Sequence, residues 1–304
     1  MRLLDLTNDN LVDVFRRQCQ SFLIGILSCK RLRDVIRNLL PTVDTFELVK
    51  CSRSKIFPSL RLTTSLTHLD LSYNEFGKHG VHLASIMASG AWKRLRVLNL
   101  EACKLTNESS MEIVKNLDQL PELRVLNMRD NSLKLGKELG DQIPSLPFLE
   151  ELLLSNTQLT ASPISYIING FRSCPNLTTI DFSRNSLDYY AKIRLANALH
   201  FLPKLKVLYV DHCRMDFEGV ENLLKALLLH CINLKELRIG YNRFVSADMP
   251  KFADLVAANQ AKEGIEAIRV ALHGKITQPK KGEHQRNCAY PGCNSATCPA
   301  ALSK

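Results

Sequence analysis

One motif, Leu-x-x-Leu-x-Leu or an apolar variant of it, recurs along most of the sequence and constrains its fold more than any other feature. It opens at Leu66, Leu95, Leu123, Leu149, Leu177, Leu205 and Leu234. Successive copies are 29, 28, 26, 28, 28 and 29 residues apart, which leaves room for a strand, a turn and a helix in each. Weaker copies precede and follow these seven, at Val43, Phe46 and Leu48 and at Ile265, Ile268 and Val270. Since one such unit cannot bury its own apolar stripe, we expect the copies to stack into one continuous core.

The ninth position of the motif alternates in residue type. It holds, in order, Asn74, Cys103, Asn131, Thr157, Asn185, Cys213 and Asn242. A buried side chain at the end of a strand must hydrogen-bond backbone groups that have left the sheet. Asn can both donate and accept hydrogen bonds there, whereas Cys and Thr are smaller side chains that can make fewer of them. The repeating unit is therefore a pair of motif copies.

The alternation and the period near 28 residues resemble the ribonuclease-inhibitor class of leucine-rich repeats, over roughly residues 43–272. The resemblance implies an α/β fold: a horseshoe-shaped solenoid with a parallel sheet on the concave face and helices on the convex face. The segments between motif copies support these helices. Ser162 followed by Pro163 predicts a helix with Ser162 as its N-cap, and residues 218–231 carry apolar side chains at helical spacing.

Charge and composition divide the chain into three parts. We expect a helical N-terminal module at 1–42, the solenoid at 43–274 with seven clear and two degenerate repeats, and a basic, cysteine-containing, largely disordered tail at 275–304. Residues 62–274 carry 24 basic and 23 acidic side chains, so most of the net charge of +10 lies at the two ends. A nearly neutral solenoid argues against nucleic acid as a partner, and no apolar run is long enough to span a membrane. We expect a monomer.

The cysteines of the solenoid follow the repeat rather than a disulfide pattern. Cys103 and Cys213 occupy the ninth position, and Cys174 and Cys231 each lie three residues before a motif. Such periodic thiols are expected to be buried and reduced, as in a cytoplasmic or nuclear protein. Acidic residues near the N-terminus disfavour a secretory leader.

The outward positions of the sheet are the predicted partner-binding surface. Side chains between and just after the motif leucines project from the concave face, because neighbours along a strand alternate between its two faces. Tyr and Arg are favoured where binding energy concentrates. The candidate residues are Asp70, Tyr73, Glu101, Arg129, Asp130, Arg184, Tyr209, Asp211, His212, Arg238 and Tyr241. We expect a non-enzymatic scaffold that binds a protein partner on this face; the alternative is that these are ordinary exposed strand positions.

The N-terminal segment resembles a degenerate F-box. In that family a small helical module docks on the adaptor of a cullin-type ubiquitin ligase, while the repeats select the substrate. The resemblance assigns adaptor binding to Leu6, Leu11, Val14, Phe15, Cys29 and Leu32. Two positions depart from the family, since Thr7 stands where it usually has Pro and Leu32 where it usually has Trp. The alternative is a helical cap that shields the first repeat, which an open solenoid requires.

No motif predicts catalysis or a cofactor. Gly77 and Gly80 lack the lysine of a phosphate-binding loop and the third glycine of a dinucleotide fingerprint. The tail holds four possible zinc ligands without the paired Cys-x₂-Cys of common zinc modules: His284, Cys288, Cys293 and Cys298. Activators of Ran-type GTPases have similar repeats, which makes a GTPase-activating regulator a further alternative, but they typically carry an acidic tail and this tail is basic.

Overall fold

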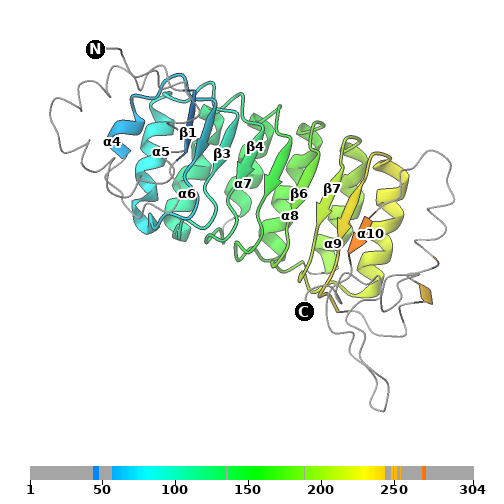
Figure 1. The fold of residues 1–304 in the computed structure, drawn as a ribbon. Coiled ribbons are helices and arrows are strands. Elements are labelled where there is room, and N and C mark those ends of the chain that lie inside the picture. Colours follow the sequence, from blue (N-terminus) through cyan, green and yellow to red (C-terminus); the bar gives the residue numbers. More distant parts are fainter. Residues whose placement is uncertain are drawn as a thin grey trace, which may run out of the picture.

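Nine strands of the described residues pair into one parallel sheet, in the order in which they follow along the chain. The computed structural model describes residues 44–47, 57–134, 136–187, 189–243, 248, 250, 251, 254 and 269–271. Figure 1 shows the strands side by side along one face of an elongated array, with the helices packed behind them. This is the leucine-rich-repeat solenoid that the motif predicts.

Each strand is three residues long, and helical segments connect most strands to the next. The strands are β1 (Thr45–Glu47), β2 (His68–Asp70), β3 (Val97–Asn99), β4 (Val125–Asn127), β5 (Glu151–Leu153), β6 (Thr179–Asp181), β7 (Val207–Tyr209), β8 (Glu236–Arg238) and β9 (Arg269–Ala271). The α-helices are α4 (Phe57–Leu60), α5 (Val81–Ala88), α6 (Asn107–Lys115), α7 (Gly136–Gln142), α8 (Ala161–Gly170), α9 (Tyr189–Ala198) and α10 (Phe217–His230). Short 3-10 helices adjoin five of them: η3 (Gly77–Gly80), η4 (Leu117–Gln119), η5 (Ile143–Ser145), η6 (Phe171–Ser173) and η7 (Leu199–Phe201).

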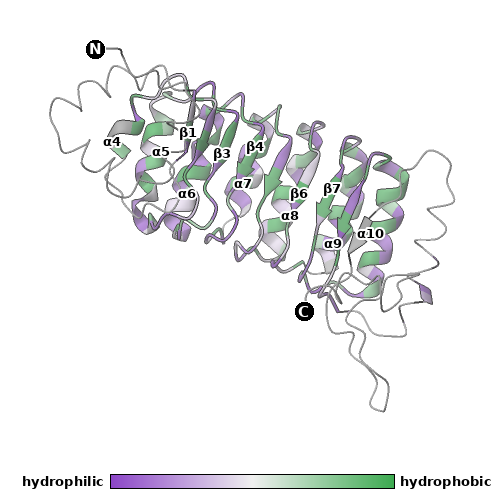
Figure 2. Ribbon diagram, in the orientation of Figure 1, coloured by the Kyte–Doolittle hydropathy of each residue, from purple (hydrophilic) through white to green (hydrophobic). Residues whose placement is uncertain are grey.

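The pairing register keeps the fourth motif residue in line from the first weak copy through the seven clear repeats, and Val270 of the last copy lies in the same row. These residues pair from strand to strand along the sheet: Phe46, Leu69, Leu98, Leu126, Leu152, Ile180, Leu208, Leu237 and Val270. In the seven clear repeats, all three apolar motif residues are at most 1% exposed, and hydrophobic residues recur strand by strand in Figure 2. At about 1.5–3 kcal/mol for each buried large aliphatic side chain, this stacked core supplies most of the favourable free energy of folding.

The two weak end copies differ in how well the pattern predicts them. In the first, Phe46 pairs with Leu69, as its place in the motif predicts. In the last, Val270 lies opposite Leu237, where the pattern predicts Ile268, so that prediction was wrong by two residues. A shift of two residues keeps each side chain on the same face of the sheet, and the apolar pattern therefore does not separate the two registers.

The ninth motif position joins neighbouring repeats through backbone hydrogen bonds. Asn131 donates from Nδ2 to the carbonyl oxygen of Leu100 (2.7 Å), and its Oδ1 accepts from the N–H of Leu105 (3.0 Å). The same two contacts to the preceding repeat are made by Asn185 and Asn242. Cys103, at the same position, donates from Sγ to the repeat before it (3.0 Å). The prediction that Asn both donates and accepts here is confirmed. Asn131, Asn185 and Asn242 each bond to the backbone of the preceding repeat, which has Cys or Thr at its own ninth position.

One helix start differs from the sequence expectation, and another has an N-cap that the sequence analysis did not name. The prediction of Ser162 as an N-cap was wrong, because Thr160 is the N-cap of α8 and Pro163 is the third residue of the helix. Pro is tolerated there because the first N–H groups of a helix have no partner within it. Helix α10 begins with Asp216 as its N-cap, and Asp216 Oδ1 accepts from the N–H of Gly219 (3.0 Å).

The four described cysteines are free thiols in the core: Cys103, Cys174, Cys213 and Cys231. Burial raises the pKa of Cys103 and Cys231 to about 12 and that of Cys174 to about 11. These thiols are therefore protonated at neutral pH and poorly nucleophilic. The prediction of periodic, buried, unpaired cysteines is confirmed for these positions.

Some predicted segments lie outside the described residues. They are the N-terminal module with its F-box-like residues (Leu6, Leu11, Val14, Phe15, Cys29 and Leu32) and the tail with its possible zinc ligands (His284, Cys288, Cys293 and Cys298). The roles of these residues and the boundaries of the three expected domains stay predictions. Within the part of the chain that is described, no helix has the length and apolar character needed to cross a membrane.

Candidate functional site

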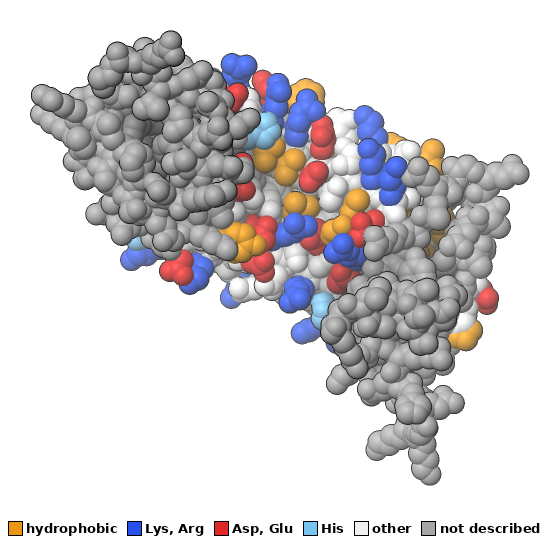
Figure 3. Space-filling model, viewed as in Figure 1, with side chains coloured by type: hydrophobic (Ala, Val, Ile, Leu, Met, Phe, Trp, Pro, Cys, Tyr) orange, Lys and Arg blue, Asp and Glu red, His pale blue; other side chains and the backbone are white. Residues whose placement is uncertain are grey.

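The outward face of the sheet, hereafter the sheet face, gathers the predicted binding residues. Because strand residues alternate between core and solvent, the fifth motif position points outward, and the seventh and eighth follow in the turn. The fifth position holds Asp70, Tyr209 and Arg238; the seventh holds Glu101, Arg129 and Asp211; the eighth holds Tyr73, Asp130, Arg184, His212 and Tyr241. Figure 3 shows this face, with basic, acidic and hydrophobic side chains interspersed across it.

The turn that ends each strand holds the eighth residue in the left-handed backbone region. The angle φ lies between 51° and 59° in all seven clear repeats, at Tyr73, Ala102, Asp130, Asn156, Arg184, His212 and Tyr241. This conformation costs a non-glycine residue roughly 1–2 kcal/mol. Backbone hydrogen bonds to the next repeat hold it in place, since Arg184 N–H donates to Asp211 O (2.7 Å) and His212 N–H to Gly240 O (3.0 Å). Five predicted binding residues therefore stand on a backbone with a fixed direction.

Asp and Asn side chains at the fifth motif position also accept hydrogen bonds from the backbone just after their strands. Asp70 Oδ1 accepts from the N–H of Ser72 (2.8 Å), and Asp181 Oδ1 accepts from the N–H of Ser183 (2.9 Å). The same contact, two residues on, is made by Asn99 and Asn127. A side chain of this type that bonds the backbone two residues on stabilises a turn. Asp70 is therefore a structural group as well as a member of the sheet face.

A polar network covers the N-terminal half of the sheet face. The hydroxyl of Tyr73 donates to Glu101 Oε1 (2.8 Å), and Asn127 Nδ2 donates to Glu101 Oε2 (3.0 Å). The hydrogen bond to Glu101 and its negative charge raise the pKa of Tyr73. Asn99 Nδ2 donates to Asp70 Oδ2 (2.8 Å). The half-exposed ring of Tyr73 is thus held at a defined place on the surface.

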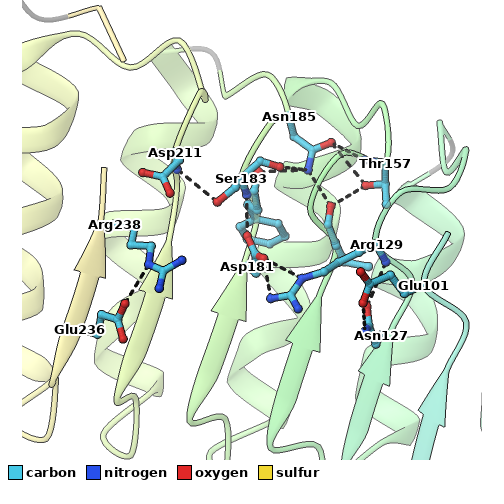
Figure 4. A network of polar contacts seen from close by, with 12 residues as sticks. Glu101, Asn127, Arg129, Thr157, Asp181, Ser183, Asn185, Asp211, Glu236 and Arg238 are labelled. Carbon is cyan, nitrogen blue, oxygen red and sulfur yellow. Dashed lines mark hydrogen bonds and ion pairs between the residues drawn. The ribbon is translucent and has the colours of Figure 1, made fainter. Parts of the chain in front are cut away.

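An ion pair crosses the middle of the sheet face. Arg129, just after β4, reaches over β5 to Asp181 at the end of β6, with Nη2 and Nε at 2.7 and 2.8 Å from Oδ2 (Figure 4). The outward residue of β5 beneath this span is Leu153, which is buried. The side chain of Asp181 is 6% exposed and that of Arg129 is 26% exposed, so both charges are sheltered and satisfied by one another. The pair fixes the guanidinium of Arg129 across the surface.

Two aromatic contacts fix the C-terminal half of the sheet face. The guanidinium of Arg238 lies over the ring of Tyr209, 4.3 Å from its centroid, a cation–π arrangement. The rings of His212 and Tyr241 stack with centroids 4.2 Å apart and an interplanar angle of 6°. Burial and the positive charge of Arg184 lower the pKa of His212, which favours its neutral imidazole.

The predicted residues differ in how far they are exposed. Asp70, Glu101, Arg129 and Asp211 take part in hydrogen bonds or ion pairs within the sheet face and are only partly exposed. The exposed members are Tyr73, Asp130, Arg184, His212, Arg238 and Tyr241. The surface as a whole offers planar rings and oriented charges, which suits contact with another macromolecule. Among the described residues, no group of three or more His, Cys, Asp or Glu side chains could hold a metal ion.

The sequence analysis left out the tenth motif position, whose exposed residues are Glu75, Lys104, Gln158, Arg214 and Arg243. This position is also left-handed in the Cys and Thr repeats: Lys104, Gln158 and Arg214 have φ of 50°, 62° and 59°. The tenth residues of the Asn repeats do not share this conformation. The alternation at the ninth position was the signal that could have singled out these turns.

Comparison with known proteins supports the repeat assignment. A family model described as Leucine Rich repeat matches residues 64–81. Ribonuclease inhibitor of Sus scrofa is 27% identical over 230 residues, which cover 71% of this chain and 50% of the inhibitor. NACHT, LRR and PYD domains-containing protein 12 of Homo sapiens is 27% identical over 247 residues, 78% of this chain and 23% of that protein. Tubulin-specific chaperone E of Danio rerio is 25% identical over 273 residues, which cover 81% of this chain and 49% of the chaperone.

The chain spans about half or less of the length of these relatives. The chain is thus similar to leucine-rich-repeat proteins, among them ribonuclease inhibitor and the NACHT, LRR and PYD domains-containing proteins. None of these comparisons supports the F-box-like interpretation of residues 1–42.

Proposed function

We propose that this chain is a non-enzymatic scaffold that binds a protein partner on the sheet face. The observation that carries the proposal is the row of exposed Tyr, Arg and His side chains on that face, at Tyr73, Arg184, His212, Arg238 and Tyr241. Tyr and Arg are the residue types most enriched where interfaces gain their binding energy.

Pre-organisation of these side chains supports the proposal. The rings of Tyr73, His212 and Tyr241 are each held by a hydrogen bond or by stacking. Arg129 is fixed by Asp181. Side chains that are already ordered lose less conformational entropy when a partner binds, so more of the contact energy becomes affinity.

The similarity to ribonuclease inhibitor also supports the proposal, because the name of that relative states that it acts on another protein. The partner of this chain is a separate question, since the shared motif leucines are buried and the exposed sheet-face residues differ from repeat to repeat. We further propose that the protein works in a reducing compartment, the cytoplasm or nucleus. The four buried, unpaired thiols support that placement.

The proposal is tested by affinity purification of the tagged full chain, followed by mass spectrometry. Wild type is compared with a sheet-face variant, Arg184→Glu with Tyr241→Ala. The matched control is Arg172→Glu with Tyr166→Ala, on the helix side of the solenoid. Tyr166 and Tyr241 are 43% and 53% exposed, so the two variants remove similar surface.

We expect the specific partners of the wild type to be lost from the sheet-face variant and retained by the control. Partners that both variants retain in wild-type amounts would place binding elsewhere on the chain. Equal thermal stability of the two variants serves as the check that the solenoid is intact.

A further inference from the structure

The repeats of β6, β7 and β8 concentrate arginines and aromatic rings at one end of the sheet face. The residues concerned, here called the C-terminal patch, are Arg184, Tyr209, His212, Arg214, Arg238 and Tyr241. The three strands are direct neighbours in the sheet. All members except Tyr209 are exposed.

Among the described residues, the carboxylates of Asp181, Asp211 and Glu236 flank the C-terminal patch, and each is already engaged. Asp181 is bonded by the arginine that crosses β5. Asp211 Oδ1 accepts from a backbone N–H of the next repeat (2.6 Å). Glu236 accepts from Arg238 Nε (2.8 Å), as Figure 4 shows. These three acidic groups are therefore bound to the protein's own donors.

Two arginines of the patch have no such partner. Within the described ranges neither Arg184 nor Arg214 forms an ion pair, and both stand in left-handed turns with φ of 59°. The pKa of His212, next to Arg184 in the adjacent turn, is lowered by burial and by the charge of Arg184, which favours the neutral imidazole. The two exposed guanidinium groups are thus free to bind an external anion, and their fork geometry matches a carboxylate.

The rings beside these arginines supply contact area. The His212–Tyr241 stack presents one continuous flat surface, and Tyr241 is 53% exposed. Tyr209 is covered on one face by Arg238. Aromatic surface next to unpaired arginine is the combination that protein interfaces use as anchors.

We propose that the C-terminal patch binds an acidic segment of the protein partner, with Asp or Glu carboxylates on Arg184 and Arg214 and apolar atoms on the ring of Tyr241. This inference rests on the proposed function and adds the chemistry of the partner. A polypeptide fits better than a nucleic acid because the solenoid, residues 62–274, is nearly neutral and offers no continuous basic track for phosphates.

The other half of the sheet face defines where such a segment can lie. At the fifth, seventh, eighth and tenth motif positions of the repeats that open at Leu66, Leu95 and Leu123, four residues are acidic and two are basic. The acidic residues are Asp70, Glu75, Glu101 and Asp130, and the basic ones are Lys104 and Arg129. Like charges repel an acidic segment there, so the segment is directed to the C-terminal patch in one position.

The test begins with a random peptide library selected against the intact full chain. One selected peptide is then labelled and titrated by fluorescence anisotropy. The patch variant is Arg184→Glu with Arg214→Glu. The control is Arg94→Glu with Arg172→Glu, two exposed arginines away from the sheet face, which change the net charge by the same amount. A third variant, Tyr73→Ala with Asp130→Arg, alters the N-terminal half of the face.

We expect the selected peptides to be enriched in Asp and Glu. The patch variant should bind the labelled peptide about tenfold more weakly or worse, and the control within about twofold of wild type. Added salt should weaken binding by wild type more than binding by the patch variant. Unchanged thermal melts confirm that the variants are folded.

Three results would overturn the inference while leaving the proposed function in place. The first is a set of selected peptides without an excess of Asp and Glu. The second is a peptide whose binding is lost only with the third variant. The third is a selection that yields no binding peptide, since a short acidic segment should be enough for binding. A single-stranded oligonucleotide that competes at the patch with higher affinity than the peptide would assign the patch to nucleic acid instead. Binding that none of the variants changes would count against both the inference and the sheet face.

Discussion

The asparagines of the ninth motif position should contribute far more to stability than the cysteines that occupy the same position in alternate repeats. Asn185, which is 5% exposed, donates from Nδ2 to the carbonyl oxygens of Leu154 (2.7 Å) and Phe182 (3.0 Å). Its Oδ1 accepts from the N–H groups of Thr157 (3.2 Å) and Leu159 (3.0 Å). The substitution Asn185→Ala leaves all of these buried groups without that partner.

Each net hydrogen bond is worth roughly 0.5–1.5 kcal/mol, and an unsatisfied buried group costs roughly 1–3 kcal/mol. We therefore expect Asn185→Ala to lower the free energy of unfolding by about 3–5 kcal/mol. Cys213→Ala removes one weak donation, from Sγ to the carbonyl oxygen of Phe182 (3.3 Å), and a buried sulfur atom. Its expected cost is about 1 kcal/mol.

Urea unfolding followed by far-UV circular dichroism measures the difference between these two variants. An unchanged dependence of the unfolding free energy on urea means that the shift in midpoint reports stability alone. Asn185→Cys provides a milder variant, because Cys can keep one donation, and should fall between the other two. Losses for Asn185→Ala and Cys213→Ala that agree within about 1 kcal/mol would refute the role assigned to the asparagine.

Three further predictions concern helix packing and the thiols. Asp216→Asn keeps an N-cap for α10 but removes the charge that faces the buried Lys192 (2.9 Å), so it should cost about 1 kcal/mol at neutral pH. Burial opposes the ionised form of Asp216, but the hydrogen bond and charge of Lys192 and the N–H of Gly219 hold its pKa below 3.8. The difference from wild type in chemical unfolding should therefore be complete above that pH and disappear as the pH falls through the lowered pKa; a difference that grows in acid would contradict this. Gly140→Ala would bring a Cβ to 2.6 Å from backbone atoms of Tyr166, so α7 and α8 would have to move apart. Thermal melting should show a loss of stability of about 1–3 kcal/mol. An unchanged melting curve would contradict the close approach of the two helices. Finally, alkylation at mildly alkaline pH, mapped by peptide mass spectrometry, should leave Cys103, Cys174, Cys213 and Cys231 unmodified in the folded chain and modify them in denaturant, because burial raises the pKa of each thiol.

The stacked core was predictable because the motif states it directly. The residue at the fourth motif position of each clear repeat, from Leu69 to Leu237, lies where its spacing predicts. The alternation of Asn with Cys or Thr likewise predicts the hydrogen bonds between neighbouring repeats. The weak last copy was not predictable to the residue, because registers two residues apart bury the same face. Short-range spacing therefore specifies the repeat, and the ends depend on contacts that spacing does not encode.

The sequence predicts which residues lie on the sheet face but not which contacts their side chains make with one another. Alternation along a strand places Tyr209 and Arg238 outward, but no sequence rule says that these two side chains stack on one another. The Arg129–Asp181 pair joins residues 52 positions apart across an intervening strand. Left-handed turns at residues such as Arg184 were also hidden, since glycine, the usual marker of that conformation, is absent there.

The central claim is that a partner covers the sheet face, and hydroxyl-radical footprinting of the tyrosines in the purified complex tests it most directly. Tyr73 and Tyr241 are 46% and 53% exposed on the sheet face, whereas Tyr166 and Tyr190, on the helix side, are 43% and 71% exposed. The two pairs are oxidised in the same sample, so each complex carries its own control. The account predicts that the partner protects Tyr241, and Tyr73 if it extends along the face, while Tyr166 and Tyr190 react as in the free chain. Protection of Tyr166 and Tyr190 with Tyr73 and Tyr241 unchanged would contradict it.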